Sequence, residues 1–367
     1  MSRHDTSPRI PVASPELGSR ERERVLDVLD SGLLADGPEV RAFEEEFATQ
    51  CGVDHAVGTA NGTAALHAAL RACGIGEGDT VVTTPLSFVA TANAVRFCGA
   101  RPVFADVDPE TYNLDPESVR AVVEREGGVD AVLPVHLYGL PADVDALADI
   151  AAERDAALVE DAAQAHGARY RGDPVGSLGD AAAFSFYPTK NMTTGEGGMV
   201  VTDEESVADR AARFVNHGRD GTGTYVDVGH NFRMTSIAGA IGRAQLPRLD
   251  AFVRARRRNA ARLNDALVDS AVTTPVEPDG RRHAYHQYTV RCEHRDALVA
   301  HLDDAGIDTG VYYPDPIHEL PAYDGVDASC PVAERAAREV VSLPVHPALT
   351  DEQVERVATA LREYDDP

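Results

Sequence analysis

The segment Ser-Phe-Tyr-Pro-Thr-Lys-Asn-Met-Thr-Thr-Gly-Glu-Gly-Gly, residues 185–198, lies between two short apolar runs and carries the only lysine of the chain, Lys190. Lysine and arginine together number 34, so the other 33 cationic side chains are arginine. A guanidinium stays protonated, whereas a lysine amine in a pocket can lose its proton and condense with a carbonyl group. We therefore predict that Lys190 is a Schiff-base lysine rather than a surviving surface lysine.

Short runs rich in valine and alanine surround this segment along the chain. They are candidate strands at residues 81–84, 102–107, 131–135, 157–161, 181–186 and 199–202. Helix-length segments separate several of them, for example residues 89–98 and 144–154. This alternation predicts an α/β fold with a mainly parallel central sheet flanked by helices. Ligands of such a sheet gather at the carboxyl ends of its strands.

The chain of 367 residues is long enough for two domains. We expect residues 1–250 to form the large domain, which opens with an irregular lead-in through residue 18 and helices near residues 19–30 and 40–51. Residues 251–367 are expected to form a smaller α+β domain. The basic run Arg-Ala-Arg-Arg-Arg at residues 254–258 predicts a long connecting helix with a solvated face paired with acids.

The net charge is −26, with 60 acidic residues. Nucleic acids and anionic membranes are polyanions, so neither is expected as a partner. The first residues lack an apolar targeting segment and no apolar run has membrane length, which favours the cytoplasm. An acidic surface almost without lysine suggests a halophilic protein. Five widely spaced cysteines indicate neither a disulfide framework nor a zinc site, and no metal site is predicted.

A glycine-containing turn, Gly-Thr-Ala-Asn-Gly-Thr at residues 58–63, precedes a predicted helix with apolar residues at helical spacing. Free N–H groups and the dipole at a helix start suit a phosphate dianion, and the Thr63 hydroxyl can add a hydrogen bond. A glycine turn that caps a helix for structural reasons alone explains the pattern equally well.

Two acidic residues, Glu160 and Asp161, end the candidate strand at residues 157–161, and Gln164 follows. A buried carboxylate is costly unless it is paired, so Asp161 is expected to face a cation such as a protonated pyridine nitrogen. Capping of a helix is the structural alternative for Asp161.

Ser185 ends the next candidate strand, five residues before Lys190, where its hydroxyl can add a second phosphate contact. A phosphate cradle, a strand-end acid, an amide and an amine together fit pyridoxal 5'-phosphate. That cofactor offers a phosphate, a ring nitrogen, a phenolic oxygen and an aldehyde to match them.

Several longer motifs occur in a fixed order along the chain. They are Asn-Gly-Thr-Ala-Ala-Leu (61–66), Ser-Phe-Val-Ala-Thr-Ala-Asn (87–93), Pro-Val-His-Leu-Tyr-Gly (134–139), Glu-Asp-Ala-Ala-Gln (160–164), Ser-Phe (185–186) with Lys-Asn (190–191), Asn-Phe-Arg-Met (231–234), and Tyr-Pro (313–314) with His318, Leu320, Pro321 and Tyr323. With these motifs the chain resembles the DegT/DnrJ/EryC1/StrS family of pyridoxal-phosphate sugar aminotransferases over nearly its whole length. The resemblance implies an aspartate-aminotransferase-like fold of type I.

The resemblance also implies roles for individual residues. Lys190 would form the Schiff base with the cofactor and then move a proton between carbon atoms. Asp161 would keep the pyridine nitrogen protonated, and Gln164 would contact the ring hydroxyl. The other implied cofactor contacts are the phosphate ligands Gly62, Thr63 and Ser185, the ring-stacking Phe88, and Asn231, which would reach the phosphate of the neighbouring subunit. The last contact implies a homodimer with shared active sites.

The implied reaction is a ping-pong transamination. An amino acid, expected to be L-glutamate, leaves its amine on the cofactor, and a keto-sugar attached to a nucleoside diphosphate takes it. His318, Tyr313 and Arg233 are the expected substrate contacts, Arg233 because a guanidinium can bind anionic groups in a bidentate way. A surface histidine in a proline-rich loop is the structural alternative for His318, and Asp315 in that loop leaves the sugar unassigned.

Three other interpretations compete with this one. A dehydratase branch of the family carries histidine where this chain has Lys190, so the lysine argues against it. A regulatory or scaffold protein that binds the cofactor without turnover would be excluded by a half-reaction with glutamate. A desulfurase or decarboxylase would need its own substrate groups, and no reactive cysteine motif supports one.

Overall fold

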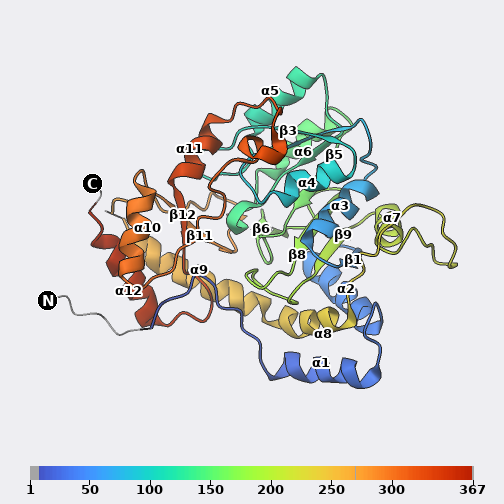
Figure 1. Cartoon of the computed structure of the whole chain (residues 1–367), viewed down its shortest axis with the longest axis horizontal. Helices are drawn as coiled ribbons and strands as arrows, with labels where there is room; N and C mark the ends of the chain where they lie inside the picture. Colours follow the sequence, from blue (N-terminus) through green and yellow to red (C-terminus); the bar gives the residue numbers. More distant parts are fainter. Residues whose placement is uncertain (1–7, 269, 366–367) are drawn as a thin grey trace.

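A seven-stranded sheet forms the centre of the molecule in the computed structural model, which describes residues 8–268 and 270–365 (Figure 1). In spatial order its strands are β1 (His55–Thr59), β9 (Gly198–Thr202), β8 (Ala181–Ser185), β5 (Ala157–Asp161), β4 (Ala131–Leu133), β2 (Thr80–Thr83) and β3 (Arg101–Phe104). The five strands from β8 to β3 pair in parallel, whereas β9 is antiparallel to both of its neighbours. The predicted α/β fold with a mainly parallel sheet is confirmed.

Helices cover both faces of this sheet because successive strand side chains point to opposite sides. The helices of this part are α1 (Ser19–Ser31), α2 (Pro38–Cys51), α3 (Gly62–Ala72), α4 (Ala90–Phe97), α5 (Pro116–Glu126), α6 (Val144–Ala152), α7 (Glu205–Val215) and α8 (Ser236–Gln245). Ala181 and Ala183 of β8 pack toward α3, α4 and α7. Ala182 and Phe184 of the same strand pack toward α2 and α8 on the other face, which α5 and α6 continue.

The C-terminal part builds a second core around a long helix, α9 (Leu249–Ala266). Its other elements are β11 (Tyr288–Arg291), α10 (Arg295–Asp304), β12 (Val340–Leu343) and α12 (Asp351–Arg362), with β11 antiparallel to β12. Ile10 of the N-terminal lead-in packs into this core; residues 1–7 of the lead-in lie outside the described part. The domain division at residue 250 stays a prediction, and α9 runs through it without a break. A small antiparallel sheet of β10 (Arg281–Arg282), β6 (Arg169–Tyr170) and β7 (Asp173–Pro174) joins the two parts.

The segment from Ile317 to Val340 packs against the large part instead of the second core. It contains the short helices η3 (Ile317–Glu319) and η4 (Pro321–Tyr323) and the helix α11 (Pro331–Glu339). Tyr323 and Ala333 share one apolar cluster with Phe104 of β3. The side chain of Asp106, just after β3, accepts the N–H groups of Val332 and Ala333 at 3.0 and 2.9 Å. A carboxylate at a helix start satisfies N–H groups that lack partners within the helix.

The basic run on α9 departs from its predicted solvated face at one position. Arg257 pairs with Glu277 at 2.8 Å, as expected of an arginine on that face. Arg256, however, is buried and donates to the carbonyl oxygens of Tyr285 and His286, each at 3.2 Å. The expectation was wrong for Arg256, because α9 lies between the two parts and turns this position inward. Among the described residues, no helix combines the length and hydropathy that a membrane span requires.

We expect Asp106→Ala to reduce the free energy of unfolding by about 1–2 kcal/mol, because two N–H groups of α11 lose their acceptor. Asp106→Asn, which keeps one acceptor oxygen, should lose less. Asp327→Ala at an exposed position is the matched control and should change stability little. Chemical denaturation measures all three, and an Asp106→Ala protein as stable as the control would contradict the capping role.

Candidate active site

The carboxyl ends of two neighbouring strands meet at one edge of the sheet. Asp161 is the last residue of β5, and Ser185 is the last residue of its parallel neighbour β8. The chain then turns, with the Lys190 N–H donating to the carbonyl of Tyr187 at 2.9 Å. This edge is where an α/β sheet binds its ligands, and the structure brings together at it the acid and the amine that the sequence singled out.

The Asp161 carboxylate is buried, with 4% of the residue exposed. Its Oδ2 accepts the Thr91 hydroxyl at 2.8 Å, and its Oδ1 accepts the Ala163 N–H at 3.2 Å. Burial raises the pKa of Asp161 above its ordinary value, whereas these two donors and the Lys190 amine favour the charged form. The bond to Ala163 closes a local turn, and no helix begins within the described residues 162–180, so the alternative that Asp161 caps a helix is wrong.

The Lys190 amine lies in the electrostatic field of the Asp161 carboxylate. Desolvation lowers the pKa of Lys190 from 10.5 to about 8, although Asp161 favours the protonated amine. The residue as a whole stays partly exposed. An amine with a pKa near 8 is neutral in roughly a tenth of the molecules at pH 7, against well under a thousandth for an ordinary lysine, and the neutral form is the one a nucleophilic lysine requires.

The start of α3 lies directly against the end of β8. A Cβ atom added to Gly62 would lie 2.6 Å from the Cβ of Ser185, so this close approach needs glycine. Asn61 caps the helix by accepting the N–H of Ala64 at 2.9 Å. The described residues provide no acceptor for the N–H groups of Gly62 and Thr63. These two N–H groups and the Ser185 hydroxyl are the donor set that an anion at this edge would meet.

Gln164 connects this edge to the second part of the molecule. Its Oε1 accepts the N–H of Tyr138 at 2.8 Å, and its Nε2 donates to the hydroxyl of Tyr313 at 2.9 Å. The Tyr138 and Tyr313 rings stack with centroids 6.1 Å apart. Burial raises the pKa of Tyr313, and the nearby Asp161 carboxylate raises it further. The structure therefore places Tyr313 beside Gln164 and Asp161, as a residue at this site must be.

Phe88 lies in the turn between β2 and α4 and leaves 61% of its surface exposed. Asn231 is also exposed and forms an antiparallel bridge with Asn216. Arg233 is partly buried, and its guanidinium donates to the Asn216 side chain. Arg233 also bridges to Thr59 at the end of β1. The roles of these three residues toward ligands stay predictions.

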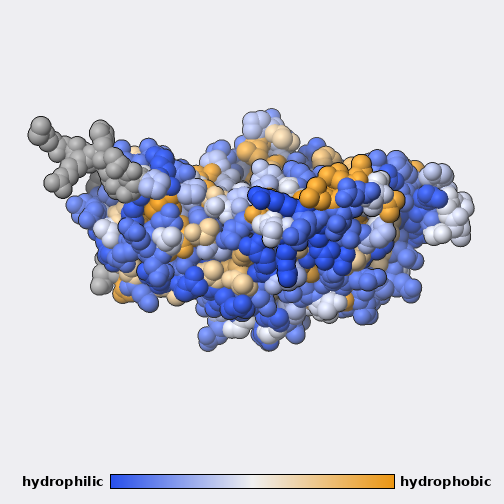
Figure 2. All heavy atoms as spheres, turned by 90° about the horizontal axis from the view of Figure 1, so that it is seen from below, coloured by the Kyte–Doolittle hydropathy of each residue, from blue (hydrophilic) through white to orange (hydrophobic). Residues whose placement is uncertain are grey.

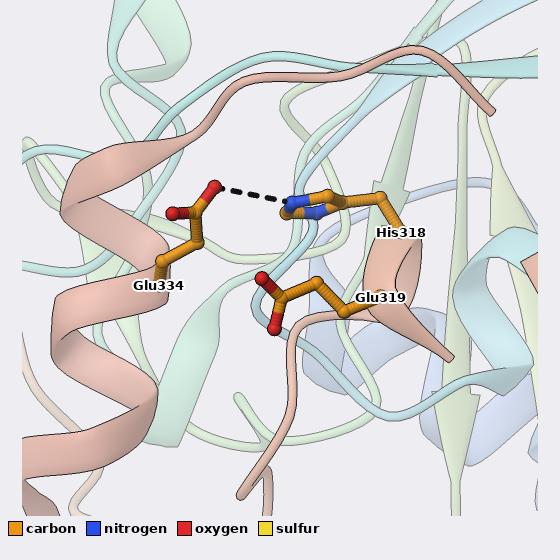
Figure 3. A group of neighbouring side chains, drawn as sticks. All are labelled: His318, Glu319 and Glu334. Carbon is orange, nitrogen blue, oxygen red and sulfur yellow. Dashed lines mark hydrogen bonds and ion pairs between the residues drawn. The ribbon is translucent and has the colours of Figure 1, made fainter. Parts of the chain in front are cut away.

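His318 occupies a separate group on η3 and α11 (Figure 3). Its side chain is 6% exposed, and its Nε2 lies 3.3 Å from Oε1 of Glu334. Figure 3 shows the carboxylate of Glu319 on the same side of the ring, and the donor atoms of the three residues lie within 4.8 Å of one another. Such a group could hold a divalent cation, which the sequence did not indicate because Glu334 follows sixteen residues after His318. The predicted substrate contact of His318 stays untested.

Sequence reasoning missed two side chains at the site. Thr91 lies inside a quoted motif, and its spacing of four from Ser87 at the start of a helix was a usable signal. His136 is fully buried and lies 2.9 Å from Glu160, the acid next to Asp161. Glu160 and Asp161 thus point to different partners, although they are adjacent in the chain.

Because Lys190 is the only lysine, an amine-reactive label reports on it directly. We expect labelling of the cofactor-free protein to rise with a midpoint near pH 8 rather than near 10.5. Asp161→Asn should lower the midpoint further, since the carboxylate favours the protonated amine, and the exposed Asp209→Asn should not. Peptide mass analysis separates Lys190 from the N-terminal amine, and a wild-type midpoint near 10.5 would contradict the desolvated site.

Known proteins resemble this chain over nearly its whole length. The chain matches the DegT/DnrJ/EryC1/StrS aminotransferase family over residues 15–362. It is 42% identical over 375 residues to dTDP-3-amino-3,4,6-trideoxy-α-D-glucose transaminase of Streptomyces venezuelae, covering 99% of this chain and 98% of that protein. It is 42% identical over 349 residues to a protein of Geobacillus stearothermophilus named pleiotropic regulatory protein, covering 93% of each.

A solved structure agrees with the fold as well. The crystal structure of S. venezuelae DesV in complex with a ketimine intermediate superposes with a TM-score of 0.94 and 41% identity, covering 97% of this chain and 98% of that one. The identity and coverage confirm both the predicted fold and the predicted resemblance. The chain belongs to the DegT/DnrJ/EryC1/StrS aminotransferase family.

Proposed function

We propose that this protein transfers an amino group from an amino acid, with L-glutamate as the expected donor, to a keto-sugar attached to a nucleoside diphosphate. It is an aminotransferase that depends on pyridoxal 5'-phosphate. The observation that carries the proposal is the desolvated Lys190 amine beside the buried Asp161 carboxylate at the carboxyl edge of the sheet.

The residues at this edge fit the cofactor group by group. The close contact of Gly62 with Ser185 brings the Ser185 hydroxyl next to the start of α3. This hydroxyl and the N–H groups of Gly62 and Thr63 form a donor set that suits the phosphate of the cofactor. Asp161 suits the ring nitrogen, and the Gln164 amide suits the ring hydroxyl. The exposed Phe88 ring is available for stacking. When bound, the cofactor supplies the electron sink for the reaction.

The protein itself supplies orientation and proton transfer. The Lys190 Nζ can accept and return a proton, because a pKa of about 8 allows both protonation states near neutral pH. The Asp161 carboxylate, held by Thr91 and Ala163, can keep a proton on the ring nitrogen by charge pairing. Tyr313, whose hydroxyl accepts from the Gln164 amide, is the proposed substrate contact on this side.

The nucleotide-sugar substrate is supported by the Streptomyces relative, whose name is that of a dTDP-sugar transaminase. Arg233 is the proposed contact for the anionic part of the substrate, with His318 as a further candidate. A cytoplasmic location and adaptation to high salt remain predictions from the sequence.

We further propose that the protein acts as a homodimer. Exposed apolar side chains gather over α1 and the turn that follows it, as the hydrophobic patch in Figure 2 shows; they include Leu26, Leu29, Leu33 and Leu34. A second exposed set, Tyr225, Val226 and Val228, lies on the segment that projects beyond α7 (Figure 1). Asn231 follows this segment and, by the family resemblance, would reach the neighbouring active site. Contiguous apolar surface of this kind favours a protein partner, and a second copy of the chain is the partner that the shared-site prediction requires.

The absorbance spectrum with pyridoxal phosphate tests the proposed function. Wild-type protein should bind the cofactor and show its long-wavelength band, L-glutamate should bleach that band, and Lys190→Ala should not form it. A nucleotide-linked keto-sugar added after glutamate should restore the band. If glutamate and other amino acids leave the band unchanged, the protein does not transaminate and the interpretation as a regulatory protein gains support.

Analytical ultracentrifugation tests the dimer. We expect the wild type to sediment with twice the mass of one chain, and Val228→Asp to weaken association because it places a charge in the apolar surface. Val268→Asp is the matched control, since Val268 is 78% exposed, compared with 86% for Val228, but lies at the end of α9. A monomeric wild type at micromolar concentration would contradict the proposal.

A further inference from the structure

The turn between β2 and α4 has two sides with different chemistry. Phe88 is largely exposed, whereas Ser87 and Thr91 are buried, with 5% and 1% of their surface exposed. Thr91 is the second residue of α4, and its N–H donates to the carbonyl of Phe88 at 3.1 Å, which ties the start of the helix to the turn. The turn and the start of α4 together present an aromatic ring on one side and two hydroxyls on the other.

The two hydroxyls form a chain of hydrogen bonds that ends on Asp161. Thr91 Oγ1 donates to Asp161 Oδ2 at 2.8 Å, and Ser87 Oγ lies 2.9 Å from Thr91 Oγ1. An ionised carboxylate accepts only, so the single hydroxyl hydrogen of Thr91 is committed to Asp161. Ser87 must then be the donor to Thr91. The direction runs from Ser87 through Thr91 to Asp161.

We propose that Thr91, itself held by Ser87, is a positioning residue that keeps the Asp161 carboxylate charged and aimed at the ring nitrogen of the cofactor. This inference rests on the proposed function. In this proposal neither the Thr91 nor the Ser87 hydroxyl contacts the cofactor, because both act through Asp161.

The other groups that face Asp161 cannot replace this donor. The Lys190 amine favours the charged carboxylate in the free protein, but under the proposed function it is occupied by the cofactor. His136 also favours the charged carboxylate of Asp161, but its Nδ1 accepts the N–H of Ala142 at 3.0 Å and its Nε2 faces Glu160 at 2.9 Å, so neither ring nitrogen donates to Asp161. Tyr313 lies nearby and its hydroxyl accepts from Gln164, but no hydrogen bond joins that hydroxyl to Asp161. Thr91 and the Ala163 N–H are therefore the donors that persist when the cofactor is bound.

Loss of the Thr91 hydroxyl has a defined sign. A hydrogen bond to the charged form lowers the pKa of a carboxyl group, so removing it raises the pKa of Asp161, which burial already raises. The charge pairing with the ring nitrogen is lost as the pH falls through that pKa. Thr91→Val should therefore lose cofactor affinity at a higher pH than the wild type does.

The chain offers a matched control in Thr83 of β2. It is fully buried, and its hydroxyl donates to the carbonyl of Leu133 at 2.8 Å rather than to Asp161. Thr83→Val removes the same atoms and one buried hydrogen bond of similar length. Any effect of lost stability should therefore appear in both variants, and an effect through Asp161 should appear in Thr91→Val alone.

The experiment is equilibrium dialysis of pyridoxal phosphate against wild type, Thr91→Val, Thr91→Ser, Ser87→Ala and Thr83→Val across the pH range in which the wild type loses the cofactor. We expect the acidic limb of Thr91→Val to move up by about one pH unit, which is about a tenfold loss of affinity on that limb. Thr91→Ser should match the wild type, and Ser87→Ala should move in the same direction by less. Thermal unfolding of the cofactor-free proteins records stability separately.

A limb that moves equally in Thr91→Val and Thr83→Val, or in neither, would overturn the proposal while the wild type still binds cofactor. A Thr91→Ser limb that moves as far as that of Thr91→Val would also overturn it, because the hydroxyl would then not matter. If the wild type does not bind pyridoxal phosphate, the proposed function fails and this inference fails with it. If Thr91→Val does not fold, Thr91→Ser and Ser87→Ala against Thr83→Val decide the question.

Discussion

The central constraint on this structure is the buried carboxylate of Asp161 beside the amine of Lys190. A buried charge is tolerated when donors and an opposite charge surround it, and Asp161 receives these from separate parts of the chain. Thr91 comes from the first turn of α4, Ala163 from the turn after β5, and Lys190 from the connection between β8 and β9. The sheet order places these connections at one edge. The topology thus brings together the partners that the buried carboxylate requires.

The same edge explains how an anion site can form next to a carboxylate. The start of α3 contributes N–H groups and the positive end of its dipole, and glycine at position 62 lets the helix approach Ser185. The same row of strand ends thus provides a site for a cationic ring nitrogen and a site for an anionic phosphate.

Much of this arrangement could be predicted from residues close together in sequence. The strand that ends at Asp161 has the predicted bounds, Ala157–Asp161, and the helix Ser19–Ser31 differs from prediction by one residue. Contacts between distant residues could not be predicted in this way. The bond from Thr91 to Asp161 spans 70 positions and that from Gln164 to Tyr313 spans 149. Local periodicity carries no information on such pairs, on the antiparallel direction of β9, or on the inward turn of Arg256.

Adjacent acids on one strand show how local geometry separates two functions. Side chains alternate across a strand, so Glu160 and Asp161 must point to opposite faces. Glu160 is fully buried and uses its two oxygens to accept backbone N–H groups from Gly176, Leu178 and Gly179 and to face the His136 ring. Glu160 makes all of these hydrogen bonds inside the fold, and they occupy both of its oxygens. The two donors to Asp161 instead leave its carboxylate available at the end of the strand. A shift of this strand by one residue would exchange the two environments, so the burial of Glu160 helps to fix the register that presents Asp161 to the site.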